Sequence, residues 1–445
     1  MIISKPKSRA AASLISRIKD RTAKAGVIGL GYVGLPLSMV LVEGGFSVTG
    51  FDVSAPKVKL LNSGKSDIDD INNATVRNAV KSGKFIATAD PKKLAQMDAI
   101  SICVPTPLSK TKDPDVSFIL AAMDWVKGNL KKGALVVLES TTYPGTTEDL
   151  ILPLLEEKGL KVGKDFFLAF SPERVDPGNP TYTTHNTPRV VGGCTPDCTL
   201  VAKTFYEQSM PDVYPVSSTK AAEMVKLLEN TFRSVNIGLV NEVALMCDRL
   251  KVNVWEIINA AATKPFGFMP FYPGPGLGGH CIPIDPHYLS WKLKSLNYYA
   301  RFIELAGDVN SHMPEYVVDR ITDLFNRRLV KAINKSSVLV LGIAYKRDIQ
   351  DLRESPALDV IKLLEDKGAR VTYNDPFIPS FRWNGGQVKS VKLTAAALRK
   401  ADMVIILTDH TQYDYQEIVN EAKVVFDTRN ATSDVKKRRN KIELL

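Results

Sequence analysis

A single cysteine, Cys281, lies in a stretch built largely from glycine and proline, "PGLGGHCIPIDP" at residues 275–286. Glycines let backbone approach a ligand closely, and prolines fix the path of a loop. These surroundings favour a thiol that meets a substrate over the buried structural thiol that is the usual state of a free cysteine. Asp285, four residues later, is a candidate carboxylate for orienting or activating a water molecule.

Lys226 and Asn230 are spaced to share one face of a helix. The segment from about Thr219 to Leu250 contains no proline and is apolar on more than one side, which predicts a long helix. A lysine on such a helix is costly unless it is paired or functional. With Asn230 it could hold a substrate oxygen and stabilise an alkoxide as hydride leaves. The alternative is a lysine whose ammonium simply reaches water.

The sequence "GLGYVG" at residues 29–34 predicts a dinucleotide-binding turn between a strand and a helix. In such a turn Gly29 permits the tight bend, Gly31 lets a pyrophosphate approach, and Gly34 allows the helix to pack on the strand. Asp52 follows Gly29 by 23 residues, at the end of the next predicted strand. This spacing is typical of the acid that binds the adenosine ribose, so NAD is predicted as the cofactor in preference to NADP.

These residues together indicate oxidation of an alcohol to an acid. A thiolate that adds to an intermediate aldehyde forms a thiohemiacetal, which can lose hydride to become a thioester. His280 precedes Cys281, but neighbours in an extended loop point apart, so a cysteine–histidine dyad is not favoured. Three alternatives remain: a two-electron hydroxyacid dehydrogenase of the 6-phosphogluconate type, which needs no cysteine; a non-catalytic nucleotide-binding protein; and a cysteine hydrolase.

Short β-branched runs alternate with helical patterns at both ends of the chain. Strands are predicted at 25–29, 46–53, 99–105 and 134–141, and again at 337–345, 370–376 and 402–410. The predicted fold is therefore α/β, with two Rossmann-like doubly wound parallel-sheet domains joined by a central long-helix segment. The expected division is an N-terminal basic arm at 1–23, an NAD-binding domain at 24–216, a central helical segment with the cysteine loop at 217–315, and a second Rossmann-like domain at 316–445, to which the family resemblance described below assigns UDP binding.

The composition is that of a globular protein, with 44% hydrophobic and 24% charged residues. No apolar run predicts a membrane span, the basic N-terminal segment lacks the features of a signal peptide, and five cysteines suit reduced thiols in the cytoplasm. Cys194 and Cys198 lack further zinc ligands, so no metal is expected. The net charge of +10 comes without a nucleic-acid recognition motif, and a nucleotide is the expected anion.

Seven stretches resemble the UDP-glucose/GDP-mannose dehydrogenase family, over roughly residues 24–435. They are "GLGYVGLPL", "VPTPL", "ESTTYPGTT", "SPERVDPGNP", "KAAEMVKLLENT", "PGPGLGGHCIPIDP" and "GIAYKRDIQDLRESP". The resemblance implies an N-terminal NAD-binding domain, a central helical segment that forms a homodimer, and a C-terminal domain that binds the UDP part of a UDP-sugar.

The resemblance also implies roles for individual residues. Cys281 corresponds to the nucleophile, Lys226 to the lysine that stabilises the oxyanion, and Asn230 to its hydrogen-bonding partner. Asp285 and Thr141 correspond to the pair that holds water, and Glu173 to the glutamate assigned to acid–base work. Besides the glycines and Asp52, the expected cofactor contacts are Tyr32, Val33, Pro105, Thr106 and Thr141. The expected substrate contacts are Glu173, Arg174, Lys226, Asn230, Phe271, Gly278, Lys346 and Arg353.

Two departures from UDP-glucose dehydrogenases concern the sugar. Pro177 stands where those enzymes carry a second glutamate, and the stretch before the cysteine, residues 263–281, is longer and places His280 where they have an aromatic residue. This pattern is similar to the branch that acts on UDP-N-acetylhexosamines. The expected substrate is UDP-N-acetylglucosamine, oxidised at C6 for surface polysaccharide precursors, with UDP-glucose, UDP-N-acetylgalactosamine and UDP-N-acetylmannosamine as alternatives.

Overall fold

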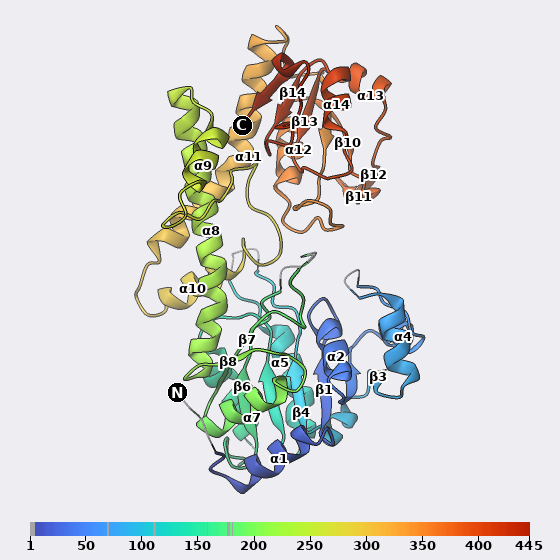
Figure 1. Cartoon of the computed structure of the whole chain (residues 1–445), viewed down its shortest axis with the longest axis vertical. Helices are drawn as coiled ribbons and strands as arrows, with labels where there is room; N and C mark the ends of the chain where they lie inside the picture. The colour runs from blue at the N-terminus through green and yellow to red at the C-terminus, as the bar shows by residue number, and fades with distance from the viewer. Residues whose placement is uncertain (1–4, 69–70, 110–112, 158, 176–178, 180) are drawn as a thin grey trace. The chain divides into compact units, whose positions relative to one another are not determined.

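The computed structural model describes residues 5–68, 71–109, 113–157, 159–175, 179 and 181–445, so Pro177 lies outside the described residues. The chain forms two units, which Figure 1 shows with their helices and strands labelled. The first contains residues 1–229 and 287–297, and the second contains residues 230–286 and 298–445.

The first unit is built on an eight-stranded sheet in the order β3-β2-β1-β4-β5-β6-β7-β8. Neighbouring strands are parallel except for β6 and β7, which are antiparallel. The predicted parallel sheet is thus confirmed, with one antiparallel pair that was not predicted. The strands are β1 (Lys24–Ile28), β2 (Ser47–Phe51), β3 (Phe85–Thr88), β4 (Ala99–Ile102), β5 (Leu135–Leu138), β6 (Phe167–Phe170), β7 (Arg189–Gly193) and β8 (Val213–Pro215).

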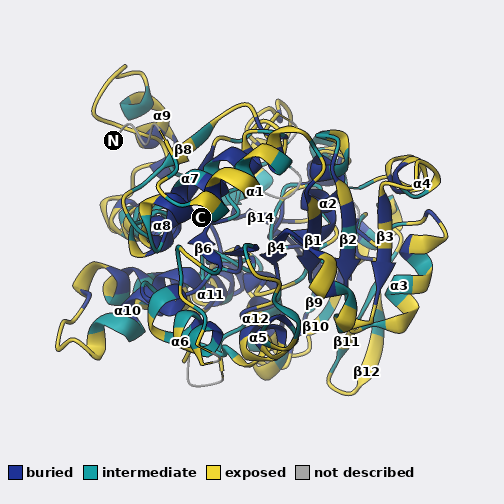
Figure 2. Ribbon diagram, turned by 90° about the horizontal axis from the view of Figure 1, so that it is seen from below, coloured by how far each residue is buried: buried dark blue, intermediate teal, exposed yellow. Residues whose placement is uncertain are grey.

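Alternate residues of these strands enter two separate hydrophobic cores. Leu135 and Val137 of β5 lie in one core, and Val136 and Leu138 lie in the other. Both faces of the sheet are therefore covered, and β1 and β4 are coloured as buried in Figure 2. The helices of this unit are α2 (Gly34–Glu43), α3 (Ala55–Asn62), α4 (Asn73–Lys81), α5 (Ser117–Asn129), α6 (Leu152–Glu156) and α7 (Pro196–Tyr206), with the short turns η1 (Pro91–Gln96) and η2 (Thr146–Ile151).

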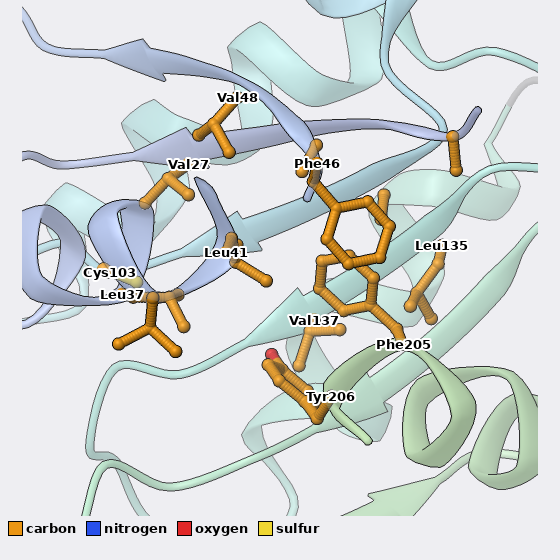
Figure 3. Close-up of a cluster of buried hydrophobic side chains, with 14 of the residues drawn as sticks. Val27, Leu37, Leu41, Phe46, Val48, Cys103, Leu135, Val137, Phe205 and Tyr206 are labelled. Atoms are coloured by element: carbon orange, nitrogen blue, oxygen red, sulfur yellow. The ribbon is translucent and has the colours of Figure 1, made fainter. Parts of the chain in front are cut away.

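The basic N-terminal residues form a helix that packs on the first unit. Helix α1 (Arg9–Lys19) contributes Ala11, Leu14 and Ile18 to the same core as Phe46 and Phe205. Figure 3 shows the rings of these two phenylalanines next to each other. Their centroids are 5.3 Å apart and their planes are tilted by 53°. Within the basic arm expected at 1–23, residues Arg9–Lys19 therefore form an amphipathic helix whose apolar face enters this core.

The second unit is built on a five-stranded parallel sheet in the order β10-β9-β13-β14-β15 and also contains a small β11–β12 hairpin. Residues Val338 and Val340 of β9 face one core, while Leu339 and Leu341 face another, so this sheet is doubly wound as well. The strands are β9 (Ser337–Leu341), β10 (Arg370–Asn374), β11 (Ser380–Trp383), β12 (Gly386–Lys389), β13 (Met403–Ile406), β14 (Val425–Asp427) and β15 (Ile442–Leu444).

Helix α8 (Thr219–Leu250) has the bounds predicted from the sequence, and the boundary between the units falls within it, after Glu229. None of the helices in the described part of the chain is long and apolar enough to cross a membrane. The remaining helices are α9 (Val254–Ala262), α10 (Asp285–Lys294), α11 (Arg301–Arg327), α12 (Pro356–Asp366), α13 (Ala395–Lys400) and α14 (Tyr415–Glu421), with the turn η3 (Arg439–Lys441).

Candidate active site

The glycine loop between β1 and α2 has the shape that a dinucleotide phosphate requires. Gly29 has φ +88°, and a Cβ there would lie 2.7 Å from the carbonyl oxygen of Cys103. At Gly34 a Cβ would lie 1.8 Å from the carbonyl oxygen of Gly29, so helix and loop touch. A Cβ at Gly31 would meet nothing within 4 Å. Two glycines are therefore required by the fold, while the third leaves backbone open to a ligand at the N-terminus of α2. These residues fit the phosphates of NAD.

Asp52 lies beside this loop at the end of β2. Its carboxylate accepts hydrogen bonds from the backbone N–H of Leu30 at 3.0 Å and of Ser54 at 2.9 Å. The side chain is half-exposed, so lone pairs remain for ribose hydroxyls. An anion at this position fits the ribose of NAD and repels the ribose phosphate of NADP.

The other predicted cofactor residues lie near the carboxyl ends of neighbouring parallel strands. Tyr32 and Val33 belong to the glycine loop, with Val33 at the N-cap of α2. Pro105 and Thr106 follow β4, and the carbonyl oxygen of Thr106 accepts a hydrogen bond from the hydroxyl of Tyr288 at 2.5 Å. The carboxyl edge of such a sheet is where nucleotides bind.

Thr141 and Glu173 follow the adjacent strands β5 and β6. Glu173 accepts hydrogen bonds from the backbone N–H of Arg174 at 2.8 Å and of Val175 at 3.0 Å. Arg174 donates to Glu229 of α8 at 2.9 Å, so its guanidinium is already engaged within the unit. Its contact with a substrate stays a prediction.

A buried ion pair that the sequence did not indicate supports Glu173. Arg189 of β7 is 3% exposed and pairs with the buried Glu139, and it also lies 3.4 Å from Glu173. The hydroxyl of Tyr206 donates to Glu139 at 2.6 Å, and its ring lies under the guanidinium. Burial raises the pKa of Glu139, while for Arg189 the opposing effect of burial is outweighed by Glu139 and Glu173, which raise its pKa. The pairing of Arg189 with Glu139 joins residues far apart in the sequence, so no local spacing predicts it.

Lys226 is a buried cation on α8. The residue is 7% exposed, and its ammonium makes no hydrogen bond or ion pair with any other residue in the described ranges. An ammonium in this state gains most from an oxygen that a ligand brings. One turn further along, the buried Asn230 donates from Nδ2 to Asp285 Oδ2 at 2.5 Å.

The turn that begins at Cys281 leads to Asp285 and so places the cysteine next to the asparagine–aspartate pair. The carbonyl oxygen of Cys281 accepts hydrogen bonds from the N–H of Ile284 at 3.1 Å and of Asp285 at 2.8 Å, which leads directly into α10. Cys281 is half-buried. The structure thus brings Asn230, Cys281 and Asp285 together within the second unit. Thr141, Glu173 and Lys226 belong to the first unit, and their meeting with Cys281 stays a prediction.

The glycines before Cys281 serve the packing of their loop on another loop of the same unit. A Cβ at Gly278 would lie 2.8 Å from Tyr345 Cβ and 2.9 Å from the carbonyl oxygen of Glu354. Gly279 has φ +91°, and its N–H donates to the carbonyl oxygen of Arg353 at 3.1 Å. The sequence suggested close approach to a ligand. The structure shows close approach to residues 345–356, and contact of Gly278 with a substrate remains a prediction.

Four side chains of the second unit are candidates for substrate contact. Phe271 packs edge-on against Phe232, with ring centroids 5.8 Å apart. Lys346 is half-buried, and the exposed Arg353 pairs with Asp351 at 2.7 Å. Arg429, which sequence reasoning missed, follows β14 and donates from Nε to Leu407 O at 3.0 Å, and burial lowers its pKa. An arginine directly after a buried strand was the available signal.

Three domains of the UDP-glucose/GDP-mannose dehydrogenase family match the chain: the NAD binding domain at residues 23–210, the central domain at 220–312 and the UDP binding domain at 339–434. The chain is 36% identical to an NDP-N-acetyl-D-galactosaminuronic acid dehydrogenase of Ralstonia nicotianae, covering 92% of this chain and 96% of that protein. It is 34% identical to a UDP-N-acetyl-D-glucosamine 6-dehydrogenase of Pseudomonas aeruginosa, covering 80% and 83%. A solved UDP-D-ManNAc dehydrogenase from Pyrococcus horikoshii superposes with a TM-score of 0.84 at 33% identity, covering 93% and 96%.

Proposed function

The chain belongs to the UDP-glucose/GDP-mannose dehydrogenase family and is an NAD-dependent UDP-sugar dehydrogenase, and we propose that its substrate is a UDP-N-acetylhexosamine, oxidised at C6 from the alcohol to the carboxylate. We further propose N-acetylglucosamine as the sugar and a precursor of surface polysaccharide as the destination of the product.

One observation carries the choice of an N-acetylated sugar. The relatives described above are named for N-acetylgalactosaminuronic acid, N-acetylglucosamine and N-acetylmannosamine, which all carry an acetamido group. The long aromatic stretch at 263–281 agrees with this choice, because an apolar lining suits the methyl of an acetamide. N-acetylglucosamine is favoured by the resemblance of this stretch and of Pro177 to that branch.

Lys226 and Asn230 are proposed to handle the negative charge that develops on the substrate oxygen. NAD, when bound at the glycine loop, supplies the acceptor for hydride in both oxidations. The ammonium of Lys226 is buried without a protein partner in the described ranges, so it can stabilise an alkoxide at little cost of reorganisation. Asn230 lies one helical turn away and can donate a second hydrogen bond to the same oxygen.

Cys281 is proposed to trap the intermediate aldehyde. The first oxidation removes hydride from C6 and a proton from its hydroxyl. The thiolate then adds to the aldehyde carbon, and loss of a second hydride from this thiohemiacetal leaves a thioester on the sulfur. Water cleaves the carbon–sulfur bond and releases the carboxylate and the thiol. Each sugar therefore consumes two NAD and one water and releases three protons.

Asp285, Thr141 and Glu173 are proposed to serve the water that attacks the thioester. Asp285 is buried and bonded to Asn230, so its carboxylate is held in one orientation close in the chain to Cys281. Glu173 is fixed by two backbone donors and by Arg189, which suits a group that must exchange protons from a defined position.

A homodimer is proposed through α8. Leu228, Phe232, Leu239, Met246 and Leu250 are all exposed, and their spacing places them along one stripe of the helix. A continuous exposed apolar stripe on a soluble enzyme marks an interaction surface, and a second copy of the same helix can cover it. The division into an arm at 1–23, a cofactor domain at 24–216, a dimerisation segment at 217–315 and a nucleotide domain at 316–445 remains part of this proposal.

The test of the substrate is a panel of UDP-sugars with NAD, followed by the absorbance of NADH. We expect the largest kcat/KM with UDP-N-acetylglucosamine, and faster turnover of all three N-acetylated epimers than of UDP-glucose. Rapid oxidation of UDP-glucose with no turnover of the N-acetylated sugars would contradict the proposal. UDP-sugar binding without any reduction of NAD would favour a non-catalytic protein.

A further inference from the structure

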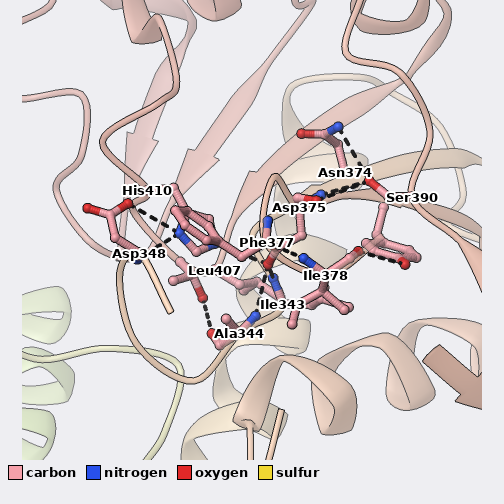
Figure 4. Close-up of polar contacts among 12 residues, drawn as sticks. Ile343, Ala344, Asp348, Asn374, Asp375, Phe377, Ile378, Ser390, Leu407 and His410 are labelled. Carbon is pink, nitrogen blue, oxygen red and sulfur yellow. Dashed lines mark hydrogen bonds and ion pairs between the residues drawn. The ribbon is translucent and has the colours of Figure 1, made fainter. Parts of the chain in front are cut away.

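Asp375, directly after β10, joins several loops of the second unit through one buried carboxylate. Its Oδ2 accepts hydrogen bonds from the N–H of Ile343 at 2.7 Å and of Ala344 at 3.0 Å, while its Oδ1 accepts from the N–H of Phe377 at 2.8 Å and of Ile378 at 3.1 Å. Figure 4 shows these bonds converging on the carboxylate. Both oxygens of this buried carboxylate are thus hydrogen-bonded by the protein.

His410, after β13, completes this arrangement. The imidazole is fully buried, and its Nδ1 faces the backbone N–H of Asp348 at 2.9 Å, so Nδ1 must be the acceptor. The proton is therefore assigned to Nε2, which donates to Asp375 Oδ2 at 3.0 Å. One ring thereby connects the segments that follow β9, β10 and β13 (Figure 4).

The segment held most extensively is the loop 343–356, which carries Lys346 and Arg353. The carbonyl oxygen of Ala344 also accepts from Thr408 Oγ1 at 2.5 Å. Within the loop, Asp348 has φ +59° and Glu354 has φ +50°. Side chains other than glycine adopt this region at a cost, so the loop conformation depends on the bonds that surround it.

The same loop supports the stretch that ends in Cys281. Gly278 and Gly279 lie against the side chain of Tyr345, Gly279 bonds to the backbone of Arg353, and a Cβ at Gly276 would lie 2.8 Å from Pro356 Cβ. All of these residues belong to the second unit. An unbroken series of contacts therefore leads from Asp375 and His410 through the loop 343–356 to the cysteine loop.

We propose that Asp375 and His410 are a positioning pair. The pair holds the nucleotide-binding loop 343–356 and the Cys281 loop in a fixed position relative to each other. Neither residue contacts the reacting atoms. The pair acts by fixing Ile343, Ala344 and Asp348, and through them Tyr345 and Arg353. The assignment of the loop 343–356 to nucleotide binding is based on the match to the UDP binding domain of the family. The importance of the Cys281 loop rests on the function proposed above for Cys281.

The decisive variants are at His410. His410→Phe keeps an aromatic ring beside Phe377, whose centroid is 5.0 Å away, but it removes both hydrogen bonds. His410→Gln can keep the donor to Asp375, and His410→Asn can keep the acceptor for Asp348. Leu364→Ala is the matched control, because Leu364 is a fully buried core residue of α12 that takes part in none of the hydrogen bonds described above, so its truncation lowers stability and leaves those bonds in place.

Two measurements that need no turnover test the proposal: the Kd for UDP by calorimetry, and the rate of alkylation of Cys281 by iodoacetamide from peptide masses, with the Cys194 peptide as internal reference. His410→Phe is expected to weaken UDP binding about tenfold, which is the size expected from lost hydrogen bonds to a charged group. The same variant is expected to change the rate at which iodoacetamide alkylates Cys281. His410→Gln and His410→Asn should each restore part of the UDP affinity and part of the alkylation rate. The Kd for NAD should stay unchanged, and Leu364→Ala should only lower the melting temperature.

His410→Phe with unchanged UDP affinity and unchanged Cys281 alkylation would overturn the proposal and leave a purely structural pair. A change in UDP affinity with an unchanged rate of Cys281 alkylation would also overturn the proposal, because the positions of the two loops would then not depend on each other. Failure of the proposed chemistry would look different: Cys281→Ala would keep full turnover, whatever the His410 variants did to UDP binding.

Discussion

Lys226 is the residue whose environment says most about the chemistry. A cation that is 7% exposed and unpaired within the described chain destabilises the fold unless a ligand supplies a hydrogen-bonding oxygen to it. Lys226→Met keeps the length and apolar stem of the side chain, and we expect kcat to fall on the order of 100-fold, the cost of one lost oxyanion donor. The melting temperature should stay the same or rise, because a buried charge is removed. Unchanged kcat in a folded variant would remove Lys226 from the mechanism.

Asp52 makes a separate prediction about the cofactor. Its carboxylate is oriented by Leu30 and Ser54 and stays half-exposed beside the glycine loop. Asp52→Ala should raise the KM for NAD and reduce the preference for NAD over NADP. The KM for the UDP-sugar should stay unchanged. Steady-state kinetics with both cofactors measures all three. Faster turnover of the unaltered protein with NADP would show that this acid does not select the cofactor.

Residue types and local spacing were enough to single out Cys281, Lys226, Asn230 and Asp285. The bond between Asn230 and Asp285 joins residues 55 positions apart in sequence, and nothing local indicates it. The same holds for Arg189 with Glu139, and for His410 with Asp375. His410 and Asp375 meet because the carboxyl ends of the parallel strands β13 and β10 lie at one sheet edge, Arg189 begins a strand antiparallel to β6, and Asn230 and Asp285 join two helices. The sequence predicts these elements but not which side chains pair across them.

The element that binds the cofactor offers two glycine substitutions with opposite consequences. Gly31→Ala places its Cβ in open space, so the free energy of unfolding should hardly change while NAD binding weakens. Gly34→Ala places its Cβ 1.8 Å from the carbonyl oxygen of Gly29, so it should destabilise the protein by about 1–3 kcal/mol. Thermal unfolding and NAD titration of both variants separate the two roles. Equal loss of stability in both would contradict this division.

Helix α8 and the strands β1, β2, β4 and β5 were predicted, although β4 and β5 have only four residues each, whereas β3, β6, β7 and β8 were not predicted. The bounds of α8 agree because a long proline-free run that is apolar on more than one side is defined by its own sequence. Strand β6 is only four residues, all buried, and such a run can be a strand or part of a buried helix. Strands β7 and β8 exist through pairing at the edge of the sheet, including the antiparallel pair of β6 and β7. Tertiary contacts decide these elements.

The whole molecule is expected to be a dimer, because Leu228, Leu239, Met246 and Leu250 of the stripe on α8 are exposed in the described chain. Leu239 is 54% exposed and lies away from the predicted catalytic residues of α8. Leu239→Asp combined with Met246→Asp should yield a monomer in light scattering, because buried carboxylates without partners are costly. Leu120→Asp, an exposed apolar position on α5, is the control that should stay dimeric. A monomeric unaltered protein at all concentrations would refute the expectation.

The central claim is that one thiol carries the sugar through two successive oxidations. The most direct measurement is the number of NADH and carboxylate molecules formed per UDP-N-acetylglucosamine consumed, with Cys281→Ala, Cys281→Ser and the control Cys194→Ala. The unaltered protein and Cys194→Ala should give two NADH and one carboxylate with no released aldehyde. Cys281→Ala should fail to complete the oxidation, and Cys281→Ser should accumulate a covalent ester visible by mass. One NADH per sugar in the unaltered protein, or undiminished two-NADH turnover in Cys281→Ala, would contradict the account.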